Sequence, residues 1–495
     1  MSLISVNQLT FYYEGSYDNI FEDVSFQIDT NWKLGFVARN GRGKTTFLKL
    51  LMGKEEYRGS ISANVKFDYF PFVVPDREKT TLEIVENLYP DREFWRICAE
   101  LTRLHVDADV LYRPFSTLSN GEQTKVMLAV LFSGENQFLL LDEPTNHLDM
   151  PARELIRDYL KSKKGFILVS HDRIFLDECV DHILVINKTN IEVCQGNFSS
   201  WWENKRRQDE YEQAENERLK KDIRRLNEAA RQASRWADSV ESTKIGTKGN
   251  VSRIEINKAD RAYIGEKSRR MQQRRKNLEH RQQSAIEEKS GLLKNIETAE
   301  DLKLFPLRHH KDILVSARDL TVIYPGKEIK IPDFSVGNGD RIVLAGANGC
   351  GKTSVIRALL GQTGYSGALE TAAGLKISYV PQDAEFLKGS LDAYAKEQKL
   401  DLTLFKALLR KLDFDRIQFE KNMEDYSGGQ KKKVLLAQSL CTQAHLYIWD
   451  EPLNFIDVFS RMQIEELILK FQPTLLMVEH DKVFVEKTAT QYVKI

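Results

Sequence analysis

Four short motifs occur twice in this 495-residue chain, and the two copies keep almost the same spacing. The paired residues are Lys44 and Lys352, Ser119 and Ser427, and Asp142 and Asp450, each 308 positions apart, with His171 and His480 at 309. Four motifs in constant register indicate an internal duplication. The chain must therefore fold as two copies of one domain, with a separate segment between them.

Each copy contains a glycine-rich loop between an apolar strand and a helix. The first reads ARNGRGKTT from Ala38, and the second reads GANGCGKTS from Gly346. Backbone N–H groups of such a loop converge on phosphate oxygens, the lysine reaches the terminal phosphates, and the next hydroxyl holds Mg²⁺. The predicted nucleotide contacts are Asn40, Gly41, Gly43, Lys44, Thr45 and Thr46, and Asn348, Gly349, Gly351, Lys352, Thr353 and Ser354. The strict pattern has glycine where the first copy has Ala38.

An apolar run that ends in two acids follows in each copy. LLLDEP places Asp142 and Glu143 after one buried strand, and LYIWDEP places Asp450 and Glu451 after the other. Without the loop upstream, these residues would be an acidic turn. With it, the first acid of each pair is predicted to hold Mg²⁺ through water and the second to polarise the attacking water.

A further apolar strand ends in a histidine in each copy. These are His171 in ILVSHD and His480 in VEHD. A lone histidine is more often structural than catalytic, but its place after a second apolar strand favours contact with a γ-phosphate. The predicted catalytic residues are Glu143, Glu451, His171 and His480.

A serine and a glycine open a helix in each copy, in LSNGEQTK from Leu118 and SGGQKKK from Ser427. Together with the other motifs, they resemble the signature sequence of ATP-binding cassette (ABC) ATPases. The resemblance implies an α/β fold with two tandem ABC-type nucleotide-binding domains. Each ATP, with Mg²⁺, would lie between the loop of one cassette and the signature of the other. The implied signature contacts are Ser119, Gly121 and Glu122, and Ser427, Gly429 and Gln430.

The resemblance also implies roles for residues outside these motifs. Tyr13 and Tyr324 stand where the family stacks an aromatic ring on adenine, although a core aromatic at a strand end fits each of them nearly as well. Gln382 in YVPQD stands where the family senses Mg²⁺, and Phe72 occupies the matching position in the first copy. The predicted metal set is Thr45, Asp142, Thr353, Gln382 and Asp450. Because a phenyl ring cannot ligate a metal, we expect the second site to hydrolyse ATP faster.

A charged segment without proline separates the two copies. Leu219, Ile223, Leu226, Ala230 and Ala233 recur at helical spacing, as do Ile264, Met271, Leu278, Ala285 and Leu292. We predict two long antiparallel helices, with a tip at residues 241–256, and the domains 1–200, 201–300 and 301–495. Residues 221–280 hold 16 Lys/Arg and 8 Asp/Glu, although the chain is formally neutral. This surplus indicates a polyanionic partner or, alternatively, a solvated Arg-rich coiled coil.

Other sequence features narrow the class of protein. The five cysteines are scattered, with no metal-ligand spacing and no pattern typical of a disulfide framework. The first residues do not read as a signal peptide, and no run of about 18 apolar residues is present. We expect a cytoplasmic protein without membrane domains.

Two cassettes joined by a charged helical linker resemble the ABC-F family of ribosome-binding ATPases. That family implies a monomeric chain whose cassettes close on ATP and enter the tRNA exit site of the bacterial 70S ribosome. The linker would reach toward 23S rRNA at the peptidyl-transferase centre and P-site tRNA, with Lys244, Ile245, Lys248 and Asn250 as candidate contacts. Alternatively, the tip is a flexible loop whose side chains hardly matter.

The chain resembles the Lsa-type antibiotic-resistance branch of ABC-F proteins. The features that carry the resemblance are the short region 72–116, the end of the chain just after its last strand, the long linker and the sequence FEDVSFQIDTNWKLGF. The resemblance implies ribosome protection against lincosamides, streptogramin A compounds and pleuromutilins. Three alternatives stay open: a general translation factor that rescues stalled ribosomes, a binding module whose ATPase is incidental, and an ATPase partner of a separate membrane permease.

Overall fold

The computed structural model describes residues 2–13, 19–146, 148–187, 190–244, 302–324, 327–347, 349–414 and 416–495. Internal contacts group the chain into two compact units. One unit combines Met1–Trp201 with Ala299–Ile495, and the other is Trp202–Thr298. The first unit therefore contains both copies of the duplicated domain.

The first copy contains two sheets. The smaller is antiparallel, in the order β2-β1-β4, with β1 at Leu3–Phe11, β2 at Phe21–Asp29 and β4 at Arg58–Ser62. The larger has the order β5-β6-β7-β3-β8-β9 and is parallel except where β9 joins β8. Its strands are β3 (Lys33–Val37), β5 (Lys66–Phe70), β6 (Gln137–Asp142), β7 (Phe166–Val169), β8 (His182–Asn187) and β9 (Asn190–Gln195).

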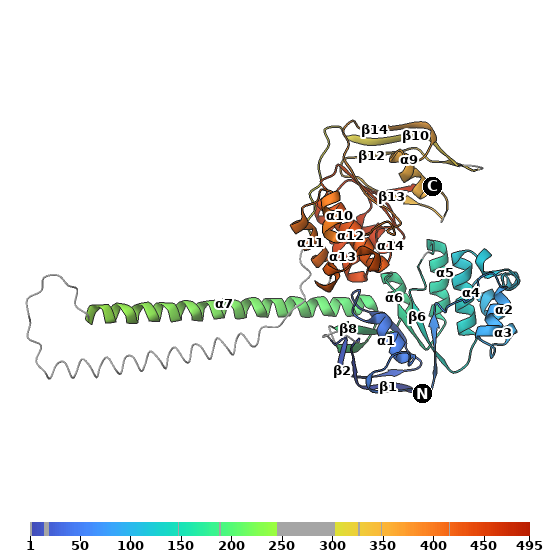
Figure 1. Ribbon diagram of the computed structural model, residues 1–495, viewed down its shortest axis with the longest axis horizontal. Coiled ribbons are helices and arrows are strands. Elements are labelled where there is room, and N and C mark those ends of the chain that lie inside the picture. Colours follow the sequence, from blue (N-terminus) through green and yellow to red (C-terminus); the bar gives the residue numbers. More distant parts are fainter. Residues whose placement is uncertain are drawn as a thin grey trace, which may run out of the picture. The chain divides into compact units, whose positions relative to one another are not determined.

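The second copy repeats this plan (Figure 1). Its antiparallel sheet joins β10 (Ile313–Tyr324) to β11 (Lys327–Lys330), β12 (Phe334–Gly337) and β14 (Tyr365–Thr371). Its parallel sheet has the order β15-β16-β17-β13-β18, with β13 (Arg341–Ala345), β15 (Ile377–Val380), β16 (Leu446–Asp450), β17 (Leu475–Val478) and β18 (Gln491–Lys494). The matching strand orders confirm the predicted α/β fold with two tandem ABC-type domains.

Helices connect the strands of both parallel sheets. In the first copy they are α1 (Lys44–Leu51), α2 (Thr81–Leu88), α3 (Phe94–Arg103), α4 (Asn120–Phe132), α5 (Met150–Lys161) and α6 (Arg173–Cys179). In the second they are α9 (Lys352–Leu359), α10 (Leu391–Glu397), α11 (Leu402–Lys411), α12 (Gly428–Cys441), α13 (Val458–Phe471) and α14 (Lys482–Thr488). Short 3-10 helices lie at Ala108–Tyr112, Phe115–Thr117, Arg416–Glu420 and Met423–Asp425. Crossover helices cover both faces of a parallel sheet, which is why β7, with the sequence FILV, is buried at every residue.

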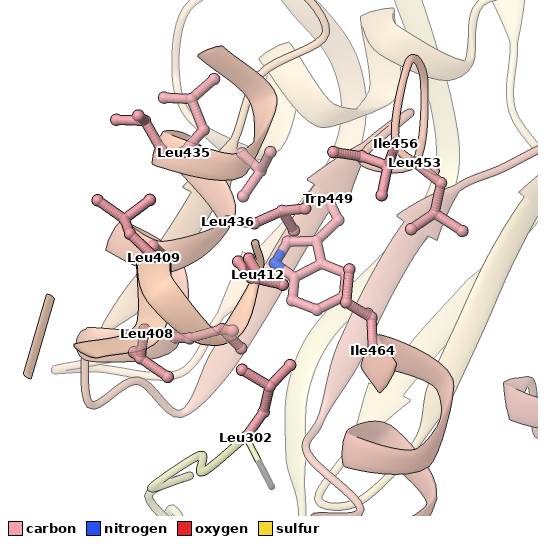
Figure 2. Packing of buried hydrophobic residues seen from close by; sticks show 14 of the residues in the cluster. Leu302, Leu408, Leu409, Leu412, Leu435, Leu436, Trp449, Leu453, Ile456 and Ile464 are labelled. Carbon is pink, nitrogen blue, oxygen red and sulfur yellow. The ribbon is translucent and has the colours of Figure 1, made fainter. Parts of the chain in front are cut away.

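The core of the second copy includes residues from the end of the linker. Leu302 and Leu304 are 5% and 1% exposed and belong to the same apolar cluster as α11 and Trp449 of β16. Figure 2 shows Leu302 beside Leu408 and the ring of Trp449. The segment that follows the linker is therefore built into the second cassette.

The linker begins with α7, a single helix of 47 residues from Phe198 to Lys244. This confirms the first predicted helix, in which Leu219 and Ile223 of the apolar seam are half-buried. The side chains of Leu226, Ala230 and Ala233, the tip beyond residue 244 and the predicted second helix lie outside the described residues. Across the part of the chain that the structure describes, no helix is long and apolar enough to span a membrane.

Candidate nucleotide-binding sites

The first glycine-rich loop connects β3 to α1. Lys44 Nζ donates to the carbonyl oxygen of Ala38 at 2.8 Å and lies 3.3 Å from Asn40 Oδ1, so the ammonium group reaches back across the loop. Gly41 and Gly43 have φ angles of 85° and 90°, which residues with a Cβ rarely adopt. Burial lowers the pKa of Lys44 from its ordinary value, against the opposing effect of nearby carboxylates. A half-buried cation held over a glycine loop fits an anionic ligand such as phosphate.

The second loop has the same geometry between β13 and α9. Lys352 Nζ donates to the carbonyl oxygens of Gly346 and Ala347 at 2.8 Å and 2.9 Å. The main-chain acceptor at residue 346 thus corresponds to that of Ala38 in the first loop. A Cβ on Gly346 would lie 2.6 Å from Cys350 Sγ and 2.7 Å from the carbonyl oxygen of Ile495, so only the first loop has room for alanine.

The remaining predicted loop residues lie around these lysines. Gly349 and Gly351 have φ angles of 77° and 116°. Ser354, in the first turn of α9, is 9% exposed. Asn348 lies outside the described residues.

The predicted metal ligands of the first site are brought together. Asp142 ends β6, and its Oδ2 lies 3.5 Å from Thr45 Oγ1 in the first turn of α1. The Tyr69 hydroxyl donates to the same Oδ2 at 2.8 Å. Hydroxyl and carboxylate oxygens are ligands that suit Mg²⁺, so the pair fits this ion.

The second site offers a more complete set of oxygen atoms. Asp450 is 0% exposed, and its carboxylate oxygens accept no hydrogen bond of ordinary geometry from the described residues. Burial, with a smaller contribution from Glu451, raises the pKa of Asp450 to about 6. The Thr353 hydroxyl opposes this shift, but a buried carboxylate with so few donors is unfavourable unless a cation neutralises it. Thr353 and Gln382 line the cavity beside Glu451, and together these groups fit Mg²⁺.

The predicted catalytic glutamate and histidine of each copy lie close together. His171 Nε2 lies 3.3 Å from Glu143 Oε1, and His480 Nε2 lies 3.6 Å from Glu451 Oε1. The glutamates have φ angles of 52° and 48°, in the left-handed region, which is uncommon for residues other than glycine. Such backbone strain often accompanies functional sites, and the same strain occurs at both positions.

The two glutamates differ in their electrostatic environment. Burial and the neighbouring Asp142 carboxylate raise the pKa of Glu143 to about 8. Burial acts in the same direction on Glu451, but the hydrogen bond and charge of His480 and a hydrogen bond from Gln382 lower its pKa to about 2. Asn454 Nδ2 also donates to Glu451 Oε2 at 2.6 Å. At neutral pH Glu451 is therefore ionised, whereas Glu143 is held mainly in its protonated form.

The side chain of Phe72 makes contacts of another kind. Its ring lies 5.2 Å from that of Tyr89, at an interplanar angle of 65°. Both rings line a cavity of about 490 Å³ that also includes Thr45 and Tyr69. Phe72 thus forms a hydrophobic wall where the second site has the amide of Gln382.

The predicted signature residues cap two helices. Ser119 Oγ accepts a hydrogen bond from the Glu122 backbone N–H at 3.3 Å, and Glu122 Oε2 accepts from the Ser119 N–H at 2.8 Å. Ser427 and Gln430 repeat the arrangement at 3.4 Å and 2.9 Å. These capping boxes account locally for the serine and for the Glu or Gln three residues later. Their contact with ATP stays a prediction.

The first loop and the second signature meet within the first unit. Asn40 Nδ2 donates to the backbone carbonyl oxygen of Phe455 at 2.9 Å. A Cβ on Gly429 would lie 3.0 Å from Asn40 Nδ2 and 2.5 Å from the same carbonyl oxygen. Arg39 forms an ion pair with Asp413 beside this contact. The residues predicted to share site one therefore lie together.

The second loop faces residues of the first copy across a cavity of about 350 Å³. Lys352, Thr353 and Gln382 line one side, and Asn120, from the first signature, lines the cavity with them. Ser119 and Gly121 are the immediate neighbours of Asn120 in the chain, although neither is among the lining residues. The crosswise arrangement is thus present at both loops.

Of the two tyrosines predicted to stack on adenine, the structure describes the side chain of Tyr13. Tyr13 is 42% exposed, and its hydroxyl lies 2.9 Å from Thr46 Oγ1. An exposed ring tied to α1 leaves a face open for stacking. Tyr324 is the last residue of β10, and its side chain lies outside the described residues.

Buried charges that the motifs do not include support both sites. Lys433 pairs with Asp457 at 3.1 Å, with side chains 2% and 0% exposed. Arg461 pairs with Asp481 at 3.0 Å, and Arg153 lines the cavity of the second loop. Arg153 and Arg461 are 308 residues apart, so the repeat offset alone could have identified them as equivalent residues of the two copies.

Comparison with known proteins agrees with the duplicated fold. A model described as "ABC transporter" matches residues 21–146 and 329–454, about half of the chain. "Ribosome protection protein VmlR" of Bacillus subtilis (strain 168) is 26% identical over 488 residues, covering 96% of this chain and 84% of the relative. "Energy-dependent translational throttle protein EttA" of Haemophilus influenzae is 26% identical over 528 residues, covering 95% and 88%.

A similar fold is present in a solved structure of archaeal ribosome recycling factor aABCE1 with ribosomal stalk protein aP1. The TM-score is 0.62 at 19% identity, covering 98% of this chain and 87% of that one.

The chain belongs to the ABC transporter family, with two tandem domains of that family. Its relatives include proteins of ABC-F type at about 25% identity. It is an ATP-hydrolysing enzyme whose cofactors are ATP and Mg²⁺.

Proposed function

We propose that this ATPase acts on the bacterial 70S ribosome, which it enters with both cassettes closed on ATP and leaves after hydrolysis. The observation that carries the proposal is the arm: α7 continues for 47 residues from the end of the first copy. A helix of this length spans about 70 Å. A helix of this length suits a distant target.

The charge of the linker favours a nucleic-acid target. Near the start of α7, Lys205 pairs with Asp209 at 3.0 Å and Arg207 with Glu203 at 2.7 Å, so these charges are balanced within the helix. Residues 245–280 hold 10 Lys/Arg against 4 Asp/Glu. A surplus of positive charge in this part of the sequence would neutralise rRNA or tRNA phosphates.

The names of the relatives point in the same direction. One is called a ribosome protection protein and another a translational throttle protein. Together with the sequence pattern, they support the ABC-F assignment and a cytoplasmic, ribosome-associated location for a monomeric chain. Contacts with 23S rRNA and P-site tRNA, and the domains 1–200, 201–300 and 301–495, belong to this proposal.

Within this function we propose antibiotic resistance of the Lsa type, against lincosamides, streptogramin A compounds and pleuromutilins. The effector would be the tip, with Lys244, Ile245, Lys248 and Asn250. A Gly/Ser replacement of residues 241–256 should abolish resistance and leave ribosome binding largely intact. Full resistance in the exchanged protein would refute a tip mechanism.

The first experiment uses the Glu143→Gln/Glu451→Gln protein, which should bind ATP without hydrolysing it. Ribosomes from a susceptible Gram-positive cell that expresses it are pelleted with ATP and, in a parallel sample, after ATP removal. A matched control carries Lys44→Ala/Lys352→Ala and should stay in the supernatant in both. Retention of the glutamine variant only with ATP supports the proposal, whereas its absence from the pellet under both conditions refutes it.

The alternatives predict other outcomes. A general translation factor would pellet with ribosomes in the same way but give no change in drug susceptibility. A permease partner would be recovered with membranes in place of ribosomes. An incidental ATPase would give ribosome binding that does not depend on ATP.

A further inference from the structure

The first nucleotide site has the predicted magnesium ligand Asp142 but lacks the glutamine that the second site provides. Phe72, at that position, packs against the ring of Tyr89 and supplies no oxygen or nitrogen atom. Asp142 nevertheless accepts a hydrogen bond in this site, since the hydroxyl of Tyr69 donates to its Oδ2 at 2.8 Å.

Strand register explains how Tyr69 reaches this carboxylate. β5 and β6 are parallel neighbours, and Tyr69 is paired with Leu140. Side chains two residues apart on a strand share a face, so Asp142 lies on the same face as Leu140 and diagonal to Tyr69. A long phenol crosses that diagonal, and a shorter side chain would not.

The second copy has a tyrosine in the same register without the same hydrogen bond. Tyr379 is paired with Ile448, which stands two residues before Asp450. The oxygens of Asp450 nevertheless accept no hydrogen bond of ordinary geometry within the described ranges. Gln382 lines the second cavity beside Thr353. Within the described residues, the copy with the glutamine thus shows no hydrogen bond from its tyrosine to the aspartate, whereas the copy without it bonds its aspartate to tyrosine.

We propose that Tyr69 is the positioning residue of the first magnesium site, where it orients Asp142 in place of the missing glutamine. Groups that hydrogen-bond a metal ligand fix its orientation and commonly account for about 10- to 100-fold in metal affinity. The inference concerns Mg²⁺ at one ATP site and does not depend on what the arm contacts.

The test is Tyr69→Phe in the full-length chain carrying Lys352→Ala, which confines nucleotide to the first site. Fluorescent mant-ATP binding is titrated with Mg²⁺, and the half-saturating Mg²⁺ concentration should rise about tenfold. Binding of mant-ATP in EDTA should not change, because the phenyl ring keeps the packing. The matched control, Tyr379→Phe in a Lys44→Ala chain, should leave Mg²⁺ dependence at the second site unchanged.

A rescue variant separates positioning from packing. Adding Phe72→Gln to Tyr69→Phe supplies the amide present in the second site and should restore the Mg²⁺ dependence at least in part. Two results would overturn the proposal: an unchanged Mg²⁺ requirement in Tyr69→Phe, or an equal loss of mant-ATP binding with and without Mg²⁺. A shift confined to the first site and reversed by Phe72→Gln would establish it.

Discussion

Gly429 in the second signature leaves almost no space for a side chain. A Cβ there would lie 2.5 Å from the carbonyl oxygen of Phe455, which accepts the hydrogen bond from Asn40. An ordinary contact needs about 3.4 Å, so the backbone would have to move by about 0.9 Å. Overpacking of this kind costs about 1–3 kcal/mol. Weakening the hydrogen bond adds about 1 kcal/mol.

The clash with Phe455 lies within the second cassette and is present before and after closure. We therefore expect Gly429→Ala to disfavour closure of the first site by about 1 kcal/mol, through the weakened hydrogen bond between Asn40 and Phe455. The ATP concentration that half-closes the cassettes should rise about fivefold. Closure can be followed by energy transfer between dyes on the two cassettes, in the Glu143→Gln/Glu451→Gln protein.

Gly121 provides the matched control because it occupies the same place in the first signature. A Cβ there would meet only Leu148 Cδ2, at 3.8 Å, which is ordinary contact. Gly121→Ala should change the ATP requirement by less than about threefold, or under about 0.7 kcal/mol. Equal effects of the two substitutions, or none from Gly429→Ala, would refute the steric argument.

The other predictions concern catalysis, stability and metal. Glu451→Gln should cut the steady-state ATPase rate by about 100-fold or more. Glu143→Gln should keep over half of that rate, because the raised pKa of Glu143 leaves little of its carboxylate form near neutral pH. Loss of activity in Glu143→Gln alone would reverse this ranking. Arg173→Ala should lower the free energy of unfolding by about 1.5 kcal/mol, because Arg173 and Glu465 pair at 2.5 Å with side chains 7% exposed, while Lys487 keeps an ion pair with Glu465 at 2.7 Å. Arg157→Ala removes a more exposed pair with Glu178 and should lower the free energy of unfolding by under about 1 kcal/mol. Chemical denaturation measures both variants, and equal losses would contradict the burial argument. EDTA should abolish phosphate release and added Mg²⁺ should restore it; turnover that survives chelation would be inconsistent with the metal sites.

The repeat predicted most of the fold because its offset links residues that must share a chemical task. The strand, loop and helix around each lysine, and the buried strands that end in the acids and the histidines, follow from motifs whose backbone geometry is local. The contacts around Asn40 and Gly429 required the family resemblance, since their partners lie hundreds of residues away in the chain.

Other features could not be anticipated from the sequence. Tyr69 was missed because its importance depends on strand register and on the absence of an amide at residue 72. The difference in pKa between Glu143 and Glu451 was also missed, because both residues lie in the same DEP motif but have different neighbours in the folded chain. Such differences arise from packing, which a motif does not record.

Leu302 and Leu304 have a practical consequence for exchanging parts between relatives. These leucines stand directly after the linker and fill the core beside Trp449 and α11. A chimera that transplants a foreign arm together with these residues would also replace part of the recipient's hydrophobic core. The natural point for joining sequences is therefore before residue 302, and an arm grafted there keeps the cassette that receives it whole.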